Sequence, residues 1–166
     1  MSDRASEARV NVLVADYAAA DAAGKLNVVG GAWQVTGIQA ESGLTGPVSL
    51  VVTIDLPPRF YGEEFTVEFA LLDDAGNLVQ VPGPTGGMIP LRIGQSVVAE
   101  KPAIPGQYVP EKTLWSRTQA ISTFPNGLPL RAGAAYTWSV RIDGDDAHVW
   151  KTGFYVVGAP PGPVIG

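Results

Sequence analysis

One stretch of this chain resembles a phosphate-binding loop. The segment LVADYAAADAAGKLNVVGGAWQV, Leu13 to Val35, contains a Gly-Lys step at Gly24-Lys25. A phosphate-binding loop needs Gly-x-x-x-x-Gly-Lys-Ser/Thr, so that backbone amides and the lysine surround the phosphates. Here position 19 is alanine and position 26 is leucine, so two of the four fixed positions fail.

The glycine pair that follows fails a second test. Gly30 and Gly31 are adjacent, and nothing after them reads as a helix, so the dinucleotide-binding fingerprint is absent. We therefore expect Asp21 to Gly24 to turn the chain. We expect the glycine pair to permit a bulge or a close backbone contact within a strand.

The other candidates for chemistry lie near the C-terminus. Asp143, Asp145 and Asp146 could be compared with a calcium site, but calcium takes six to eight oxygens and these carboxylates share one tight hairpin. His148 is the single histidine, and a catalytic triad would need a serine beside it. The sequence has no Gly-x-Ser-x-Gly motif that would supply such a serine. We predict no catalytic residue, no bound metal and no cofactor, and we regard His148 as a surface or edge residue.

Composition excludes several classes of partner. The chain has 166 residues, 16 acidic and 11 basic side chains, and a net charge of -5, which disfavours electrostatic binding of nucleic acid or anionic lipid. It has no cysteine and no apolar run near the roughly 20 residues that a membrane helix needs. The polar start MSDRASEARVNV is unlike a signal peptide, so we expect a soluble protein made in the cytoplasm.

Hydrophobic alternation with a period of two predicts the fold. The segments PVSLVVTIDL, EFTVEFALLD and YTWSVRID each place apolar residues on one face and polar residues on the other. Turn signals such as Asp143-Gly144 separate the strands. The pattern predicts one domain over 1–166: an all-β antiparallel sandwich of about eight strands, with jelly-roll or related Greek-key topology and at most one helical turn, from Tyr17 to Ala23.

Two regions do not fit regular strands. A proline-rich segment at about 82–112 contains the apolar residues Met88, Ile89 and Leu91. It is expected to be either a flap over its own sandwich or an arm that contacts a neighbour. An extended tail, 158–166, carries three prolines together with Val164 and Ile165.

Aromatic residues leave a second function open. Four tryptophans and five tyrosines raise a carbohydrate-binding role, because exposed rings stack on sugars. Most lie in alternating strands, where a core position is expected, and Trp115 and Trp150 are the two that the pattern does not assign. The residues expected at an interaction surface are Met88, Ile89, Leu91, Tyr108, Trp115, Val164 and Ile165.

The N-terminal pattern resembles a known group of proteins. Leu-x-x-Asp-Tyr-Ala, followed by Gly-Lys-Leu-Asn-x-x-Gly-Gly, is similar to the opening of a family of small uncharacterised β proteins from actinobacteria and their phages, and LLDDAGN and VWKTGFYVV are similar as well. The resemblance implies a fold and a phage origin, with no catalytic assignment to transfer.

With these features we expect a non-enzymatic structural or binding protein, such as a capsid decoration protein. It would act in the virion and contact other subunits, either the major capsid protein or copies of itself. The alternative is a soluble ligand-binding module, with carbohydrate as its ligand.

Overall fold

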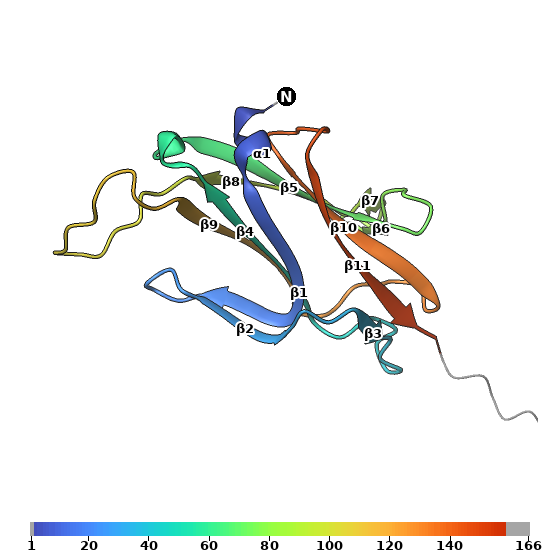
Figure 1. The fold of residues 1–166 in the computed structure, drawn as a ribbon. Helices are drawn as coiled ribbons and strands as arrows, with labels where there is room; N and C mark the ends of the chain where they lie inside the picture. Colours follow the sequence, from blue (N-terminus) through green and yellow to red (C-terminus); the bar gives the residue numbers. More distant parts are fainter. Residues whose placement is uncertain (1, 159–166) are drawn as a thin grey trace, which may run out of the picture.

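The computed structural model describes residues 2–158 and forms a sandwich of two β-sheets (Figure 1). Its elements are α1 (Asp3–Glu7), β1 (Arg9–Ala20), β2 (Leu26–Gly31), β3 (Val35–Gly37), β4 (Val48–Leu56), η1 (Pro58–Phe60), β5 (Glu64–Leu72), β6 (Gln80–Pro82), β7 (Met88–Pro90), β8 (Arg92–Val98), β9 (Ser116–Phe124), β10 (Ala134–Ile142) and β11 (Val149–Val157). One sheet has the order β2-β1-β4-β9 and the other β3-β11-β10-β5-β8, while β6 and β7 form a separate hairpin. No helix among the described residues is long and apolar enough to cross a membrane.

The alternating segments supply the core, as their pattern predicts. In β5 the burial alternates residue by residue, with Phe65, Val67, Phe69 and Leu71 inside. The middle strand β10 places Trp138 at the centre, fully buried, where its ring stacks on Phe124 at 5.8 Å between centroids. Large aromatic and branched side chains from both sheets therefore fill one continuous core.

Strand order and connections identify the topology. β4 and β9 are neighbours in one sheet, β5 and β10 are neighbours in the other, and the chain crosses between the sheets from β4 to β5 and from β9 to β10. In the second sheet β8 pairs with β5 and β11 with β10, both antiparallel, and the short β3 adds to β11 in parallel. This is the Greek-key arrangement of immunoglobulin-type sandwiches, so the Greek key is the one of the two expected topologies that the chain adopts.

A tyrosine at the start of β10 supports the same assignment. Tyr136 is buried, and its hydroxyl accepts a hydrogen bond of 2.9 Å from the backbone N–H of Arg131 in the preceding connection. A tyrosine that bonds back to the corner before this strand is a hallmark of immunoglobulin-type sandwiches.

The Gly-Lys segment is a sheet corner, as predicted. The N–H of Gly24 donates to the carbonyl of Asp21 at 2.9 Å, and Gly24 has a φ of +75°. Gly30 lies in β2 with a φ of +58°, and the Asp16 side chain occupies the space that a β-carbon at Gly30 would need. Both glycines therefore serve the backbone path of the β1–β2 hairpin.

Three expectations from the sequence need correction. Residues 2–158 form eleven strands where about eight were expected, because strands of three residues such as β3 and β6 are too short to show an alternating pattern. The helical turn expected from Tyr17 to Ala23 is wrong, since β1 continues to Ala20 and the helix is α1 instead. The region 82–112 is not one flap: residues Arg92–Val98 form β8, which pairs with β5 along its whole length.

Candidate interaction surface

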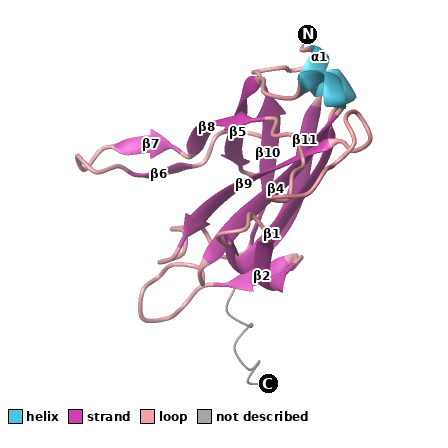
Figure 2. Ribbon diagram, turned by 90° about the vertical axis from the view of Figure 1, so that its left-hand side faces the viewer, coloured by secondary structure: helices cyan, strands magenta, loops and turns pink. Residues whose placement is uncertain are grey.

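The β6–β7 hairpin extends the β5–β8 pair beyond the sandwich (Figure 2). Its turn is closed by a 2.7 Å hydrogen bond from the N–H of Gly83 to the carbonyl of Gly87. Met88 is 62% exposed and Ile89 is 44% exposed. The hairpin therefore presents apolar side chains to solvent from a hydrogen-bonded frame.

A second segment, the loop of residues 99–115, leaves from the other end of β8 (Figure 1). Ala99 anchors its start, because the N–H of Gly62 donates to the Ala99 carbonyl at 2.9 Å. Tyr61 anchors its end through a hydrogen bond from its hydroxyl to the Leu114 carbonyl. Between these anchors Tyr108 is 84% exposed and Ile104 is 56% exposed, so the loop holds apolar groups away from the core.

Of the residues expected at the interaction surface, three are exposed, Trp115 is partly buried and one is buried. Met88, Ile89 and Tyr108 are exposed. Leu91 was wrongly expected at the surface: it is buried, because its N–H donates to the Val79 carbonyl and its side chain joins the core. Val164 and Ile165 lie outside the described residues.

The tryptophans do not form free platforms for a sugar. Trp115 is partly buried, and the guanidinium of Arg9 lies over its ring at 4.1 Å from the centroid. Trp150 is partly buried and packs against the core, as does Trp33, whose ring meets Phe154 edge-on at 5.5 Å. Each ring already has a protein partner on it.

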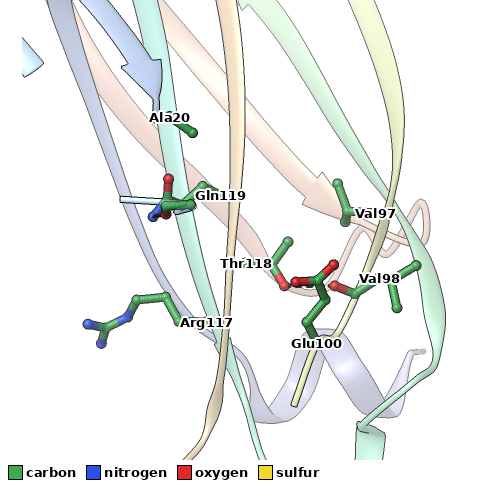
Figure 3. A pocket seen from close by; sticks show the side chains of 8 residues that line it. Ala20, Val97, Val98, Glu100, Arg117, Thr118 and Gln119 are labelled. Carbon is green, nitrogen blue, oxygen red and sulfur yellow. Dashed lines mark hydrogen bonds between the residues drawn. The ribbon is translucent and has the colours of Figure 1, made fainter. Parts of the chain in front are cut away.

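A shallow groove is lined by the tip of the β1–β2 hairpin together with residues of β8 and β9 (Figure 3). Its rim includes Gly24, Glu100 and Arg117. Arg117 makes two hydrogen bonds to Asp55, of 2.7 and 2.6 Å, and these bonds hold the pKa of the Asp55 carboxyl below its ordinary value. The Gln119 amide donates to the Gly24 carbonyl at 3.2 Å, so the hairpin tip is tied to β9. The polar groups of the groove mainly hold its walls together.

The carboxylates considered for calcium join the N-terminus to the β10–β11 hairpin instead. Asp143 accepts hydrogen bonds from Arg4 Nε at 2.8 Å, from the Ser2 hydroxyl at 2.9 Å and from the Thr66 N–H at 3.1 Å. Asp145 accepts from the Ser2 N–H at 2.5 Å. We call this set of contacts the N-terminal clasp. No group of three potential metal ligands occurs among residues 2–158.

The clasp shifts both carboxyl pKa values. Partial burial raises the pKa of Asp143, but hydrogen bonds from Thr66, Arg4 and Ser2 outweigh burial and hold it below its ordinary value. The hydrogen bond from the Ser2 N–H is the main cause of a lowered pKa at Asp145. Both carboxylates therefore stay ionised, which suits their structural role.

The remaining polar candidate also belongs to this hairpin. The Nδ1 atom of His148 lies 3.6 Å from a carboxylate oxygen of Asp145, and the His148 backbone N–H donates to that oxygen at 3.3 Å. Asp145 is itself fixed by Ser2 and Ala147. His148 is thus a peripheral member of the clasp; it lies in the turn just before β11 and is partly buried.

Comparison with known proteins gives no family for this chain, because no family model and no curated protein sequence matches it.

Proposed function

We propose that this protein is a non-enzymatic binding protein of a phage virion, of the kind that decorates a capsid, and that it attaches through the loop 99–115 and the β6–β7 hairpin. The observation that carries the proposal is the exposure of apolar side chains on both segments. A partner that buries Tyr108, Ile104 and Met88 is stabilised on them by roughly 25 cal/mol per Å² of apolar area removed from water.

The placement of the two segments favours an architectural role. They leave from opposite ends of β8, whose seven residues span roughly 23 Å in an extended strand. A lattice of subunits offers separate contacts to the two segments. A protein that lies across neighbouring capsid subunits needs two contact segments that are separated in this way.

The rigid frame behind the segments also supports binding over catalysis. The loop is tied to Gly62 and Tyr61 at its two ends, and the hairpin has its own backbone hydrogen bonds. Binding loops on a rigid sandwich lose less conformational entropy on association than free chain does. The sequence resemblance to actinobacteriophage proteins supports the virion as the setting.

Mass spectrometry of density-purified particles from the source phage, with negative-stain microscopy of the same fractions, tests the proposal. We expect the chain at a stoichiometry comparable to a capsid subunit and density on the particle surface. If the chain is absent from the purified particles, the proposal fails.

A further inference from the structure

Of the strands that stand last in a sheet among the described residues, namely β2, β9, β3, β8, β6 and β7, β2 is the one without protection. Edges β8 and β9 are bridged to each other: the Gln95 amide donates to the Ile121 carbonyl at 3.2 Å and the Thr118 hydroxyl to the Val98 carbonyl at 3.0 Å. The edge strand β3 has three residues, and β6 and β7 each have three and end in proline. Short strands, prolines and covered edges all prevent pairing with another chain.

Strand β2 has none of these features. Its sequence, LNVVGG, contains no charge and no proline, and it ends its sheet. Within β2, Val29 is 62% exposed, and Tyr17, its cross-strand partner on β1, is 53% exposed. An uncharged edge next to an exposed apolar pair is a template for another strand.

Hydrogen bonding within the β1–β2 hairpin shows which backbone groups of β2 are free. The N–H of Asp21 donates to the Lys25 carbonyl at 2.9 Å, and hydrogen-bonded pairs alternate along an antiparallel ladder. With Ala18 opposite Val28 and Ala20 opposite Leu26, those two pairs are the non-bonded ones. Leu26 and Val28 therefore direct their N–H and C=O groups outward.

We propose that β2 is a homodimer edge, at which a second copy of this chain adds its own β2 in antiparallel orientation about a two-fold axis. The register is fixed by the outward groups: Leu26 of one copy lies opposite Val28 of the other, and the reverse, which gives four hydrogen bonds. Asn27 then faces its own counterpart at the axis. Lys25 faces the Val29 position of the other copy, so no like charges meet.

The length of the edge favours a second copy over an unrelated strand. Left-handed glycines bound it, with Gly24 at a φ of +75° and Gly30 at a φ of +58°, and only two residues between them offer outward bonds. A longer strand from another protein finds no further bonded position, whereas an identical edge matches it completely. The Lys25 side chain can also cover the apolar pair of the other copy, with its ammonium near the Tyr17 ring.

Sedimentation velocity on the purified full-length protein, from about 10 μM to about 1 mM, tests the inference in the range where weak complexes dissociate. We expect a concentration-dependent dimer. Asn27→Lys and Asn27→Asp, both at an exposed position, should each weaken it at least about tenfold, because like charges meet at the axis. An equimolar mixture of the two variants should restore association as a heterodimer.

A backbone variant gives an independent reading. Val28→Pro removes an outward N–H without removing a β1–β2 hydrogen bond, so the dimer should be lost while circular dichroism stays native; Val28→Thr keeps the N–H and should retain the dimer. A protein that stays monomeric up to about 1 mM, or a dimer whose affinity in both Asn27 variants equals that of the wild type, would overturn the inference. Either result leaves the particle-binding proposal standing, because this experiment contains no particle.

Discussion

The guanidinium of Arg4 donates a hydrogen bond of 2.8 Å to the carboxylate of Asp143, which joins the first helix to the hairpin between the last two strands. Arg4 also contacts Glu63 at 2.6 Å, so one side chain links three parts of the chain. Ala5 of the same helix is 1% exposed and belongs to the core. The helix thus closes one end of the sandwich, and the clasp holds it there.

Removal of Arg4 should loosen this closure. We expect Arg4→Ala to lower the free energy of unfolding by about 1 kcal/mol, because the pairs that it loses are partly exposed. The matched control is Arg92→Ala, whose ion pair with Glu68 lies on a strand surface and links no terminus. Urea unfolding followed by tryptophan fluorescence measures both. Equal destabilisation by the two variants would contradict the role given to the clasp.

The clasp should also make stability depend on acid. The pKa of Asp143 and the pKa of Asp145 lie below their ordinary value in the folded protein, so the unfolded chain binds protons more readily. Their stabilisation is complete above the unfolded pKa, near 4, and is lost as the pH falls through the lower folded values.

The difference in melting temperature between the wild type and Asp143→Asn should therefore be constant above about pH 5 and shrink below about pH 4. Differential scanning calorimetry at intervals of pH measures it. A difference that stays the same down to about pH 2.5 would show that the Asp143 carboxylate does not contribute through its charge.

The tyrosine corner gives a prediction about stability. Tyr136→Phe removes the acceptor for the Arg131 N–H and should cost about 1 to 2 kcal/mol. Tyr155→Phe is the control, because Tyr155 is 44% exposed and should change stability by less than about 0.5 kcal/mol. Thermal unfolding of both variants decides the point; similar midpoints would show that the hydrogen bond contributes nothing net.

Two glycines in one connection separate backbone strain from a steric clash. Gly127 and Gly133 have φ values of +80° and +76°, so alanine is strained at both by about 1 to 2 kcal/mol. A β-carbon at Gly127 would also collide with the Thr45 carbonyl, whereas at Gly133 it meets open space. Gly127→Ala should therefore destabilise the fold clearly more than Gly133→Ala. If both variants lost the same free energy of unfolding, the positive φ angle alone would account for the destabilisation and the clash with Thr45 would contribute nothing.

How far the sequence predicts this molecule depends on how regular each segment is. In β5 the strict alternation around Phe69 fixes both the strand and its buried face. In β8 the inward positions include Gln95, which bonds to Ile121 and Ser122 across to β9, so a polar residue on the inner face and flanking prolines conceal a full strand. A strand can be predicted from the sequence where every inward position is apolar, as in β5, and is missed where an inward position is polar, as in β8.

The candidate surface shows a similar division. Exposure of Tyr108 follows from a proline-rich loop with no strand to pack it. Burial of Leu91 does not, because it depends on hydrogen bonds with Val79 and Leu71, far from any local signal. The clasp between Ser2 and Asp145 joins residues at opposite ends of the chain, and only the fold brings them together.

The proposed attachment of this protein to a phage particle through Tyr108 is tested most directly by co-sedimentation. Particles stripped of the chain are incubated with purified wild type, with Tyr108→Ser and with the control Tyr155→Ser, both altered at exposed tyrosines. We predict that the wild type and Tyr155→Ser pellet with the particles and that Tyr108→Ser remains largely in the supernatant, with all three melting at similar temperatures. Wild-type protein that stays in the supernatant, or Tyr108→Ser that pellets as the wild type does, would contradict the account.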